Sequence, residues 1–219
     1  YTTMSCWDTY RSAHPLMTLI HPDMMKDMMW AFVNIYKQQG KLPVWHLMGC
    51  ETDCMVGNPG VIIVADGLNK GYIADTETAF EALKNSVMLD ERGQDIRKQY
   101  GFIPYDKMKE SVANDMEYAV ADGAVALAAK KLGKAEDYEY FFKRSRSYMN
   151  FFDKELGFMR GRGTKGEFHE PFNPFASTHR DDDYCEGNAW QYTFLTPHDF
   201  EGLVECFGSK EALVKKMDE

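Results

Sequence analysis

The segment SVANDMEYAVADGAVALAAKKLG, residues 111–133, has the most regular helical pattern in the chain. Ser111 is a possible N-cap, and two lysines followed by Gly133 are typical of a helix end. The apolar side chains between them recur at spacings of three and four residues: Val112, Met116, Ala119, Val120, Ala124 and Leu127. This pattern predicts a helix with these side chains on one face.

A second helix is predicted directly after the first, from Ala135 to Phe152. Its larger side chains form one stripe: Tyr138, Phe141, Ser145, Tyr148 and Phe152. Because only two or three residues separate the two helices, they are expected to form an antiparallel helical hairpin.

Further helical windows lie on both sides of this hairpin. The pattern predicts helices over Pro22–Tyr36, Thr76–Met88, Pro197–Phe207 and Lys210–Met217. Residues 59–70 are ambiguous, because their β-branched run suits a short strand as well as a buried helix. No window alternates convincingly at period two, so we expect an all-α fold built of helical hairpins, as in a helical toroid or solenoid.

Two long polar, glycine-rich connections interrupt the helices, at residues 42–57 and 157–196. Loops of this length inside a compact domain are usually functional. We therefore expect the functional residues to lie in these loops.

Composition excludes some classes of protein. The chain has 219 residues and a formal net charge of −9, which argues against a polyanionic partner such as nucleic acid. Its longest apolar run, Val61 to Ala65, is far too short to span a bilayer. The chain begins at Tyr1 without a signal-like segment, so we expect a piece of a longer polypeptide. The five cysteines have no CxxC spacing and are expected to be buried free thiols.

Candidate chemistry gathers in the second long loop. Residues 184–192, YCEGNAWQY, place a carboxylic acid, two amides, an indole and a phenol within one short segment. These are the groups that a polyol site needs, and a glutamate beside a tryptophan can serve as a general acid. The alternative is that Glu186 is a solvated loop acid and that Trp190 packs in the core.

Two other segments carry carboxylates next to aromatic or loop residues. Asp8 lies in WDTYR, residues 7–11, where a carboxylate could accept two hydroxyl hydrogens from a vicinal diol and Arg11 could hold it in place. Glu51 lies in the first long loop, and for both acids the alternative is simple solvation. The run Asp181-Asp182-Asp183 lacks the spacing of a calcium loop and is expected to be a solvated acidic run. The histidines have no HxxxH or HExxH spacing, so a zinc hydrolase has no support.

Four ordered motifs together resemble the glycoside hydrolase family 92 α-mannosidases. The most specific is the EGNAWQY segment followed by Pro197-His198-Asp199 and Gly202-Leu203. The others are Trp7 to Arg11 with His14-Pro15-Leu16, then Leu42-Pro43-x-Trp45 through Glu51 to Gly57, then Phe158-Met159-Arg160. The similarity runs over nearly the whole chain.

The resemblance implies a calcium-dependent exo-α-mannosidase that inverts anomeric configuration, with an (α/α)6 toroid preceded by a β-sandwich. Residues 1–219 would form part of that toroid. Glu186 would be the general acid, while Trp7, Asp8 and Glu51 would line the subsite for the terminal mannose. Asn188, Trp190, Gln191 and His198 would instead shape the loop.

The resemblance also implies that this chain lacks part of the machinery. The general base and most ligands of Ca2+ would follow Glu219, so no metal ligand is assigned within the chain, and the fragment alone would be inactive. The implied substrate is a mannose-containing oligosaccharide or glycan, and the implied location is periplasmic, outer-membrane-associated or secreted in a bacterium.

Departures from the family pattern keep an alternative open. They fall at Cys50, Asn58-Pro59, Val120, Gly123 and Phe194-Leu195-Thr196. Each could mark lost activity, in which case the chain would be a non-catalytic carbohydrate-binding or structural part of a degenerate homologue. A plain helical-repeat scaffold is a third reading, but it does not explain the clustered loop aromatics and acids.

Overall fold

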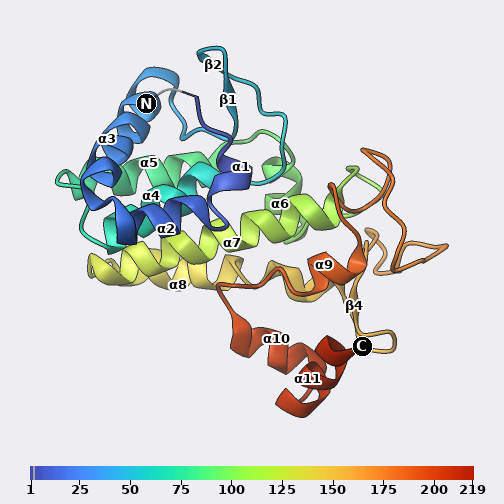
Figure 1. Cartoon of the computed structure of the whole chain (residues 1–219). Coiled ribbons are helices and arrows are strands. Elements are labelled where there is room, and N and C mark those ends of the chain that lie inside the picture. The colour runs from blue at the N-terminus through green and yellow to red at the C-terminus, as the bar shows by residue number, and fades with distance from the viewer. Residues whose placement is uncertain (2) are drawn as a thin grey trace. The chain divides into compact units, whose positions relative to one another are not determined.

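The computed structural model describes Tyr1 and residues 3–219, and most of its regular structure is helical (Figure 1). The chain divides into two compact units. The first contains residues 1–89 and 121–143, and the second contains residues 90–120 and 144–219. Helix α7, Ser111–Lys131, contributes its last part to the first unit and its first part to the second.

The first unit is a cluster of helices with one short hairpin. Besides part of α7, it contains α1 (Cys6–Thr9), α2 (Ala13–Ile20), α3 (Pro22–Gln39), β1 (His46–Leu47), β2 (Cys50–Glu51), α4 (Pro59–Asn69), α5 (Thr76–Met88) and α8 (Ala135–Arg144). Helix α4 contacts α1, α2, α3 and α5. Its apolar run is therefore buried on all sides, and this burial explains why residues 59–69 form a helix with no polar face rather than a strand.

The second unit combines shorter elements around the first part of α7. They are α6 (Gln94–Tyr100), a 3₁₀ helix (Ser147–Phe151), β3 (Phe152–Asp153), β4 (Phe158–Met159), α9 (Ala189–Thr193), α10 (Phe200–Phe207) and α11 (Lys210–Asp218). Strands β3 and β4 pair antiparallel. A buried ion pair joins Arg97 of α6 to Asp115 of α7 at 3.3 Å, and Asp115 also accepts from the Ile103 N–H and the Ser147 hydroxyl.

Most of the predicted helices are confirmed close to their predicted bounds. Helix α5 has the predicted residues, and α3 continues from the predicted Tyr36 to Gln39, where Gly40 ends it in the left-handed conformation. Helix α10 begins three residues later than predicted, because the Asp199 side chain caps it by accepting from the Gly202 N–H.

The helix predicted over 135–152 is wrong beyond Arg144. The carbonyl of Arg144 accepts from the Arg97 guanidinium at 3.0 Å, and the carbonyl of Ser145 pairs with His198 Nε2 at 2.9 Å. These side chains satisfy carbonyls at the helix end, and the chain continues as a 3₁₀ helix and a strand. The hairpin itself is confirmed, because Phe141 of α8 packs in the same core cluster as Ala121 and Val125 of α7.

The one-face pattern predicted for α7 is also incomplete. Leu127, placed on the buried face, is 55% exposed. Conversely, α7 buries side chains all round, including Asn114, Asp115, Glu117 and Asp122. From residue 111 to residue 123 the helix is buried on every side, so this part has no solvent face that its polar residues could mark.

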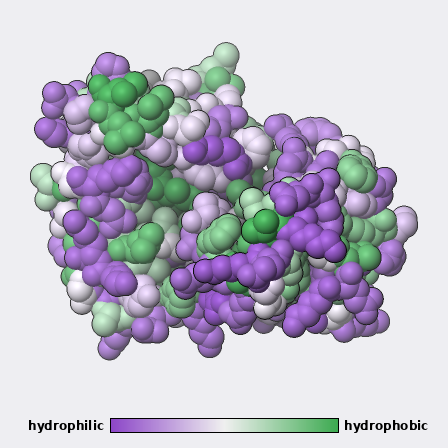
Figure 2. Space-filling view, turned by 60° about the horizontal axis from the view of Figure 1, so that its bottom comes forward, coloured by the Kyte–Doolittle hydropathy of each residue, from purple (hydrophilic) through white to green (hydrophobic). Residues whose placement is uncertain are grey.

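The cysteine prediction holds only in part. Cys6 and Cys185 are buried, whereas Cys50 and Cys54 are exposed in the first long loop. In the view of Figure 2, hydrophilic residues cover much of the surface and hydrophobic residues show as patches between them. Among the described residues, no helix combines the length and the apolar character needed to cross a bilayer.

Candidate active site

In the first unit, the Asp8 carboxylate is held by the tryptophan of the first long loop. Trp45 Nε1 donates to Asp8 Oδ2 at 3.2 Å. Asp8 lies in the single turn of α1 and is exposed to solvent. The indole thus fixes one carboxylate oxygen while the group still faces solvent, which suits an acceptor for hydroxyl groups.

The neighbouring Arg11 covers the ring of Trp7. Its guanidinium lies 4.4 Å from the Trp7 ring centroid, and it donates to the Tyr10 hydroxyl at 2.9 Å. A cation over an indole face is an attractive contact and orients the ring. The WDTYR segment therefore holds a partly buried tryptophan beside an exposed carboxylate.

The Glu51 carboxylate holds the first long loop together by accepting hydrogen bonds from its backbone N–H groups. Strands β1 and β2 form a tight hairpin in which Met48 and Gly49 both adopt positive φ. Glu51 Oε2 accepts from the Val44 N–H at 2.7 Å. Its Oε1 accepts from the backbone N–H groups of Trp45, Thr52 and Asp53, at distances of 2.9, 3.0 and 3.0 Å.

The electrostatics of Glu51 agree with this binding. Burial works to raise the pKa of Glu51, but the backbone N–H donors and His46, at 3.4 Å, stabilise the carboxylate, and the net shift of the pKa is downward. Its side chain is only 9% exposed. Glu51 thus shapes the loop that carries Trp45, and its predicted place in the sugar subsite stays a prediction.

In the second unit, the segment around Glu186 is anchored by two tyrosines. The Tyr184 hydroxyl donates to the carbonyl of Met159 in β4 at 2.7 Å. The Tyr192 hydroxyl donates to the carbonyl of Cys185 at 2.8 Å. The segment is therefore tied to β4 on one side and back to its own helix on the other.

Helix α9 begins immediately after Glu186 with a capping box. The Asn188 side chain accepts from the Trp190 N–H at 3.1 Å, and the Gln191 side chain accepts from the Asn188 N–H at 2.8 Å. Gly187 allows this close return, because a Cβ there would press against the Gln191 side chain. Asn188 and Gln191 thus shape the loop, as predicted.

Glu186 itself differs from the acids around it. Its φ is +48°, a conformation that is uncommon for a residue with a side chain and that persists only when the surroundings impose it. Its side chain is exposed and accepts no hydrogen bond from any residue that the structure describes. The fold thus holds the backbone of Glu186 firmly while its carboxyl group remains available.

Cys185, the residue before Glu186, forms a hydrogen bond with Glu110. Burial raises the pKa of the Cys185 thiol, and the negative charge of Glu110 and a hydrogen bond with it add to the rise, to about 12 in all. The N–H of Glu110 donates to the Asp182 carbonyl at 2.8 Å. Residue 110, at the start of α7, therefore holds the Glu186 loop through both its main chain and its side chain.

Trp190 is used for packing. Its ring centroid lies 4.8 Å from that of Phe158, and Lys216 Nζ lies 4.4 Å from the ring. The indole of Trp190 therefore belongs to the packing of α9 against β4 and α11, in agreement with its predicted structural role.

The acidic run 181–183 is not uniformly solvated, contrary to expectation. Asp181 is exposed and pairs with Lys109 at 2.8 Å. Asp183 is buried, pairs with His169 Nδ1 at 2.8 Å and accepts from the Ser111 hydroxyl at 3.2 Å. Its burial reflects a structural use, because these contacts tie the loop to the start of α7.

The PHD segment also has a structural use. Asp199 caps α10 and accepts from the Tyr148 hydroxyl at 2.8 Å and from Arg146 Nε at 3.0 Å. Burial works to raise the pKa of Asp199, but these donors hold it below the ordinary value. His198 pairs with the Ser145 carbonyl, so both residues position elements rather than face solvent.

Comparison with known proteins identifies the family. The model of the glycosyl hydrolase family 92 catalytic domain matches residues 1–219. The chain belongs to glycosyl hydrolase family 92.

Solved family 92 structures match the whole chain. An α-mannosidase of Bacteroides thetaiotaomicron, solved with mannoimidazole, is 37% identical with a TM-score of 0.93, and the match covers 100% of this chain and 30% of that one. An inverting mannosidase of the same organism is 30% identical with a TM-score of 0.92, over 100% of this chain and 30% of that one. The predicted fold class is confirmed: the chain is all-α and is part of the (α/α)6 toroid of the family.

A curated relative is an uncharacterized secreted glycosidase of Arthroderma benhamiae, 25% identical over 257 residues. The match covers 100% of this chain and 33% of that protein. The family 92 chain thus spans about a third of the length of the relatives it matches.

The predicted site residues fall into both units. Trp7, Asp8 and Glu51 belong to the first unit, and Glu186 belongs to the second. Sequence reasoning did not assign Trp45, although its LPxW motif carries part of the resemblance and could have marked it. It also missed Glu110, whose positive φ of 52° and contact with Cys185 leave no signal in the sequence.

Proposed function

We propose that the complete protein carrying this family 92 chain hydrolyses terminal α-linked mannose from oligosaccharides or glycans, with inversion at the anomeric carbon. The observation that carries the proposal is an exposed glutamate, Glu186, on a firmly held loop, in a chain whose family 92 relatives include α-mannosidases. One relative is named an inverting mannosidase.

Glu186 is proposed as the general acid. A general acid must reach the departing glycosidic oxygen, so its carboxyl group cannot be engaged by the protein's own donors. The carboxylates of Glu51, Asp183 and Asp199 are engaged in this way. Glu186 is exposed, and its neighbours fix the backbone from which it projects.

Asp8 and Trp7 are proposed to bind the mannose. The indole N–H of Trp45 holds one oxygen of the Asp8 carboxylate, and the remaining acceptor capacity can take hydroxyl hydrogens. The ring of Trp7 offers an apolar surface for sugar C–H groups beside it. Both groups are placed by α1, which is one turn long.

An inverting mechanism also needs a general base. The base activates water on the opposite face of the sugar, at roughly 6.5–9.5 Å from the acid. We assign no residue of this chain to that role and propose that the rest of the longer protein supplies the base.

Calcium dependence is proposed for the complete protein only. Among the described residues, no group of three or more histidine, cysteine or acidic side chains is arranged to hold a metal ion. We therefore name no calcium ligand among the described residues, and no catalytic step is assigned to the ion. Export from the cell is proposed as well, since one relative is a secreted glycosidase.

The proposal is tested by replacing Glu186 with glutamine in the complete protein and measuring two substrates. We expect kcat to fall by about 10² to 10⁴-fold on a natural α-mannoside, whose leaving group needs a proton. On an aryl α-mannoside with a good leaving group, kcat should fall much less, because that leaving group needs little protonation.

The matched control is Asp8→Ala. It should slow hydrolysis of both substrates alike, because it removes contacts to the sugar hydroxyls whatever the leaving group. Equal losses on the two substrates for Glu186→Gln would make Glu186 a binding residue. If the wild-type protein releases no mannose from any α-mannoside, the non-catalytic alternative is favoured instead.

A further inference from the structure

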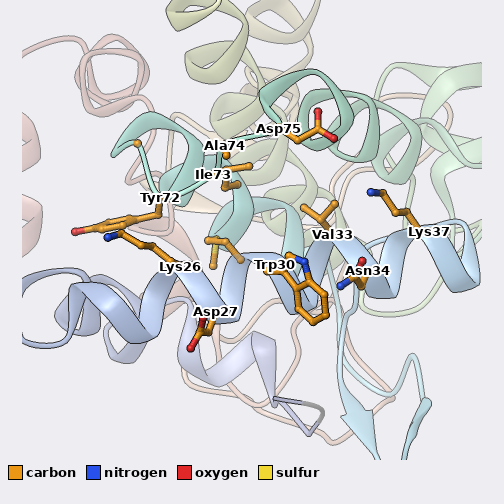
Figure 3. A pocket seen from close by; sticks show the side chains of 12 residues that line it. Lys26, Asp27, Trp30, Val33, Asn34, Lys37, Tyr72, Ile73, Ala74 and Asp75 are labelled. Atoms are coloured by element: carbon orange, nitrogen blue, oxygen red, sulfur yellow. The ribbon is translucent and has the colours of Figure 1, made fainter.

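A groove on the first unit lies between α3 and the segment that follows α4 (Figure 3). Five α3 residues on its edge are spaced along one side of the helix, at intervals of one to four residues: Lys26, Asp27, Trp30, Asn34 and Lys37. Residues 71–75 form the opposite edge. None of Trp7, Asp8 and Glu51 lines this groove.

The groove has an apolar floor and a tryptophan on its edge. Met29 and Val33 are buried beneath it. Trp30 is 72% exposed, and most of its indole therefore faces solvent. An exposed indole offers an apolar ring face and a polar N–H group side by side, and these are the two features that a sugar ring can use.

The edges of the groove carry polar groups of balanced charge. Lys26 and Lys37 stand on α3 together with Asp27, and Asp75 stands on the opposite edge. Lys26 also pairs with Asp23 at 3.3 Å, while Lys37 lies near enough to Asp75 to help lower the pKa of that carboxyl, after the Thr78 hydrogen bonds. Asn34 adds an amide that can both donate and accept.

The size of the groove suits a small ligand or a short polymer segment. Its volume is about 810 Å³, within the range of about 300–1,000 Å³ found for small-molecule sites. Two cations and two anions on the edges cancel, so the groove has no net preference for a charged ligand. A polyanion such as nucleic acid would need clustered cations instead.

We propose that this groove is a second carbohydrate-binding site that takes a neutral oligosaccharide. Trp30 provides the face for sugar C–H groups, and the lysine, aspartate and asparagine side chains bond the hydroxyls. The choice of α-linked mannose as the sugar rests on the proposed function. The groove would hold a glycan chain on the protein without taking part in its hydrolysis.

Retardation in native gels cast with soluble yeast α-mannan tests the proposal on the complete protein with Glu186→Gln. This variant keeps the mannan intact during the run. Trp30→Ala should raise the apparent Kd for mannan by about tenfold, because it removes the aromatic face. Trp30→Phe should restore part of the retardation, and Asn34→Ala should weaken it without removing the aromatic ring.

The matched control is Phe200→Ala, which removes another exposed aromatic side chain, on α10. It should leave retardation unchanged. Equal retardation of the Trp30→Ala protein and its parent would overturn the proposal, as would loss of retardation with Phe200→Ala. The proposal would also be overturned if acrylamide quenching of fluorescence showed that another part of the complete protein covers Trp30.

Hydrolysis distinguishes failure of this proposal from failure of the proposed function. With Glu186 intact, Trp30→Ala should leave kcat/KM on a small aryl α-mannoside unchanged. If the aryl mannoside is not hydrolysed while Trp30-dependent retardation persists, the proposal of a second binding site is supported and the mannosidase proposal fails. If hydrolysis is normal and the retardation does not depend on Trp30, the reverse holds.

Discussion

At the scale of single residues, hydrogen-bond donors engage some acids of the chain and leave the carboxyl group of Glu186 exposed. Glu51 is surrounded by main-chain N–H groups, and Asp199 accepts from a helix N-terminus, a tyrosine and an arginine. Glu186 has none of these partners among the described residues. In this chain, a carboxylate's availability depends on the folding of the loop around it.

Glu51→Gln is expected to loosen the first long loop. The amide would turn an NH2 group toward some of the N–H groups from which the carboxylate now accepts, and these donors would lose their partner. We expect the free energy of local opening to fall by about 1–3 kcal/mol. Hydrogen exchange of residues 42–57 in the complete protein measures this change.

The effect of Glu51→Gln should depend on pH. The pKa of Glu51 is lowered from its ordinary value of 4.5 in the folded chain. Its stabilisation is therefore complete above pH 4.5 and is lost as the pH falls through the lower folded value. The difference between wild type and variant should be largest at neutral pH and should shrink below pH 4.5.

Glu77→Gln is the control for this prediction, because Glu77 is 75% exposed and pairs with Lys134 at the surface. It should change local opening by no more than about 0.5 kcal/mol. An effect of Glu51→Gln that is as small as this, or that grows toward acid pH, would contradict the role assigned to Glu51.

At the scale of elements, the Glu186 loop is positioned by hydroxyl anchors at its two ends. Tyr184 reaches β4, and Tyr192 reaches from α9 to the carbonyl next to Glu186. The capping box at Asn188 sets the start of α9. The direction in which Glu186 projects is therefore set by α9 and β4 together.

Tyr192→Phe should remove the anchor nearest to Glu186. The buried carbonyl of Cys185 would lose its partner, and we expect a stability cost of about 1–2 kcal/mol. In the complete protein, kcat on a natural α-mannoside should fall severalfold, while KM should change less. Steady-state kinetics together with thermal melting separate these two effects.

Tyr140→Phe is the matched control, because Tyr140 lies on α8, is 48% exposed, and its hydroxyl donates to the sulfur of Met88 at 3.7 Å. It should alter neither kcat nor melting. A Tyr192→Phe protein with a raised KM and an unchanged kcat would mean that the loop binds the sugar rather than positions an acid.

At the scale of the whole molecule, the calcium expectation concerns the longer protein. The carboxylates of residues 181–183 are not arranged with other ligands into a metal site, and Asp183 bonds His169 and Ser111. We propose that other groups of the complete protein hold most of the calcium that turnover needs. Hard oxygen ligands would be expected to hold it.

Chelation tests this expectation in the complete protein. EGTA should abolish hydrolysis of an aryl α-mannoside, and added Ca2+ should restore it, whereas Zn2+ should not, because the histidines lack a zinc spacing. Asp183→Asn is the control and should leave the Ca2+ concentration for half-maximal activity unchanged. Activity that survives exhaustive chelation would remove the ion from the proposal.

The sequence by itself determined the helical class, the family and the position of the two long loops. Periodicity sufficed for α3, α5 and α7, because a helix that packs in a core repeats its apolar residues at every turn. The EGNAWQY motif pointed to Glu186, whose role stays a proposal. Its residues are neighbours in the chain, and Asn188, Gln191 and Tyr192 have local uses in the cap or the anchor.

Only the tertiary structure decided features that depend on partners distant in sequence. The helix predicted to Phe152 stops at Arg144 because Arg97 and His198 take the terminal carbonyls. Asp183 is buried because Ser111 and His169 meet it, and Trp45 matters because it meets Asp8. Local pattern cannot encode these pairings, since each depends on side chains that folding alone brings together.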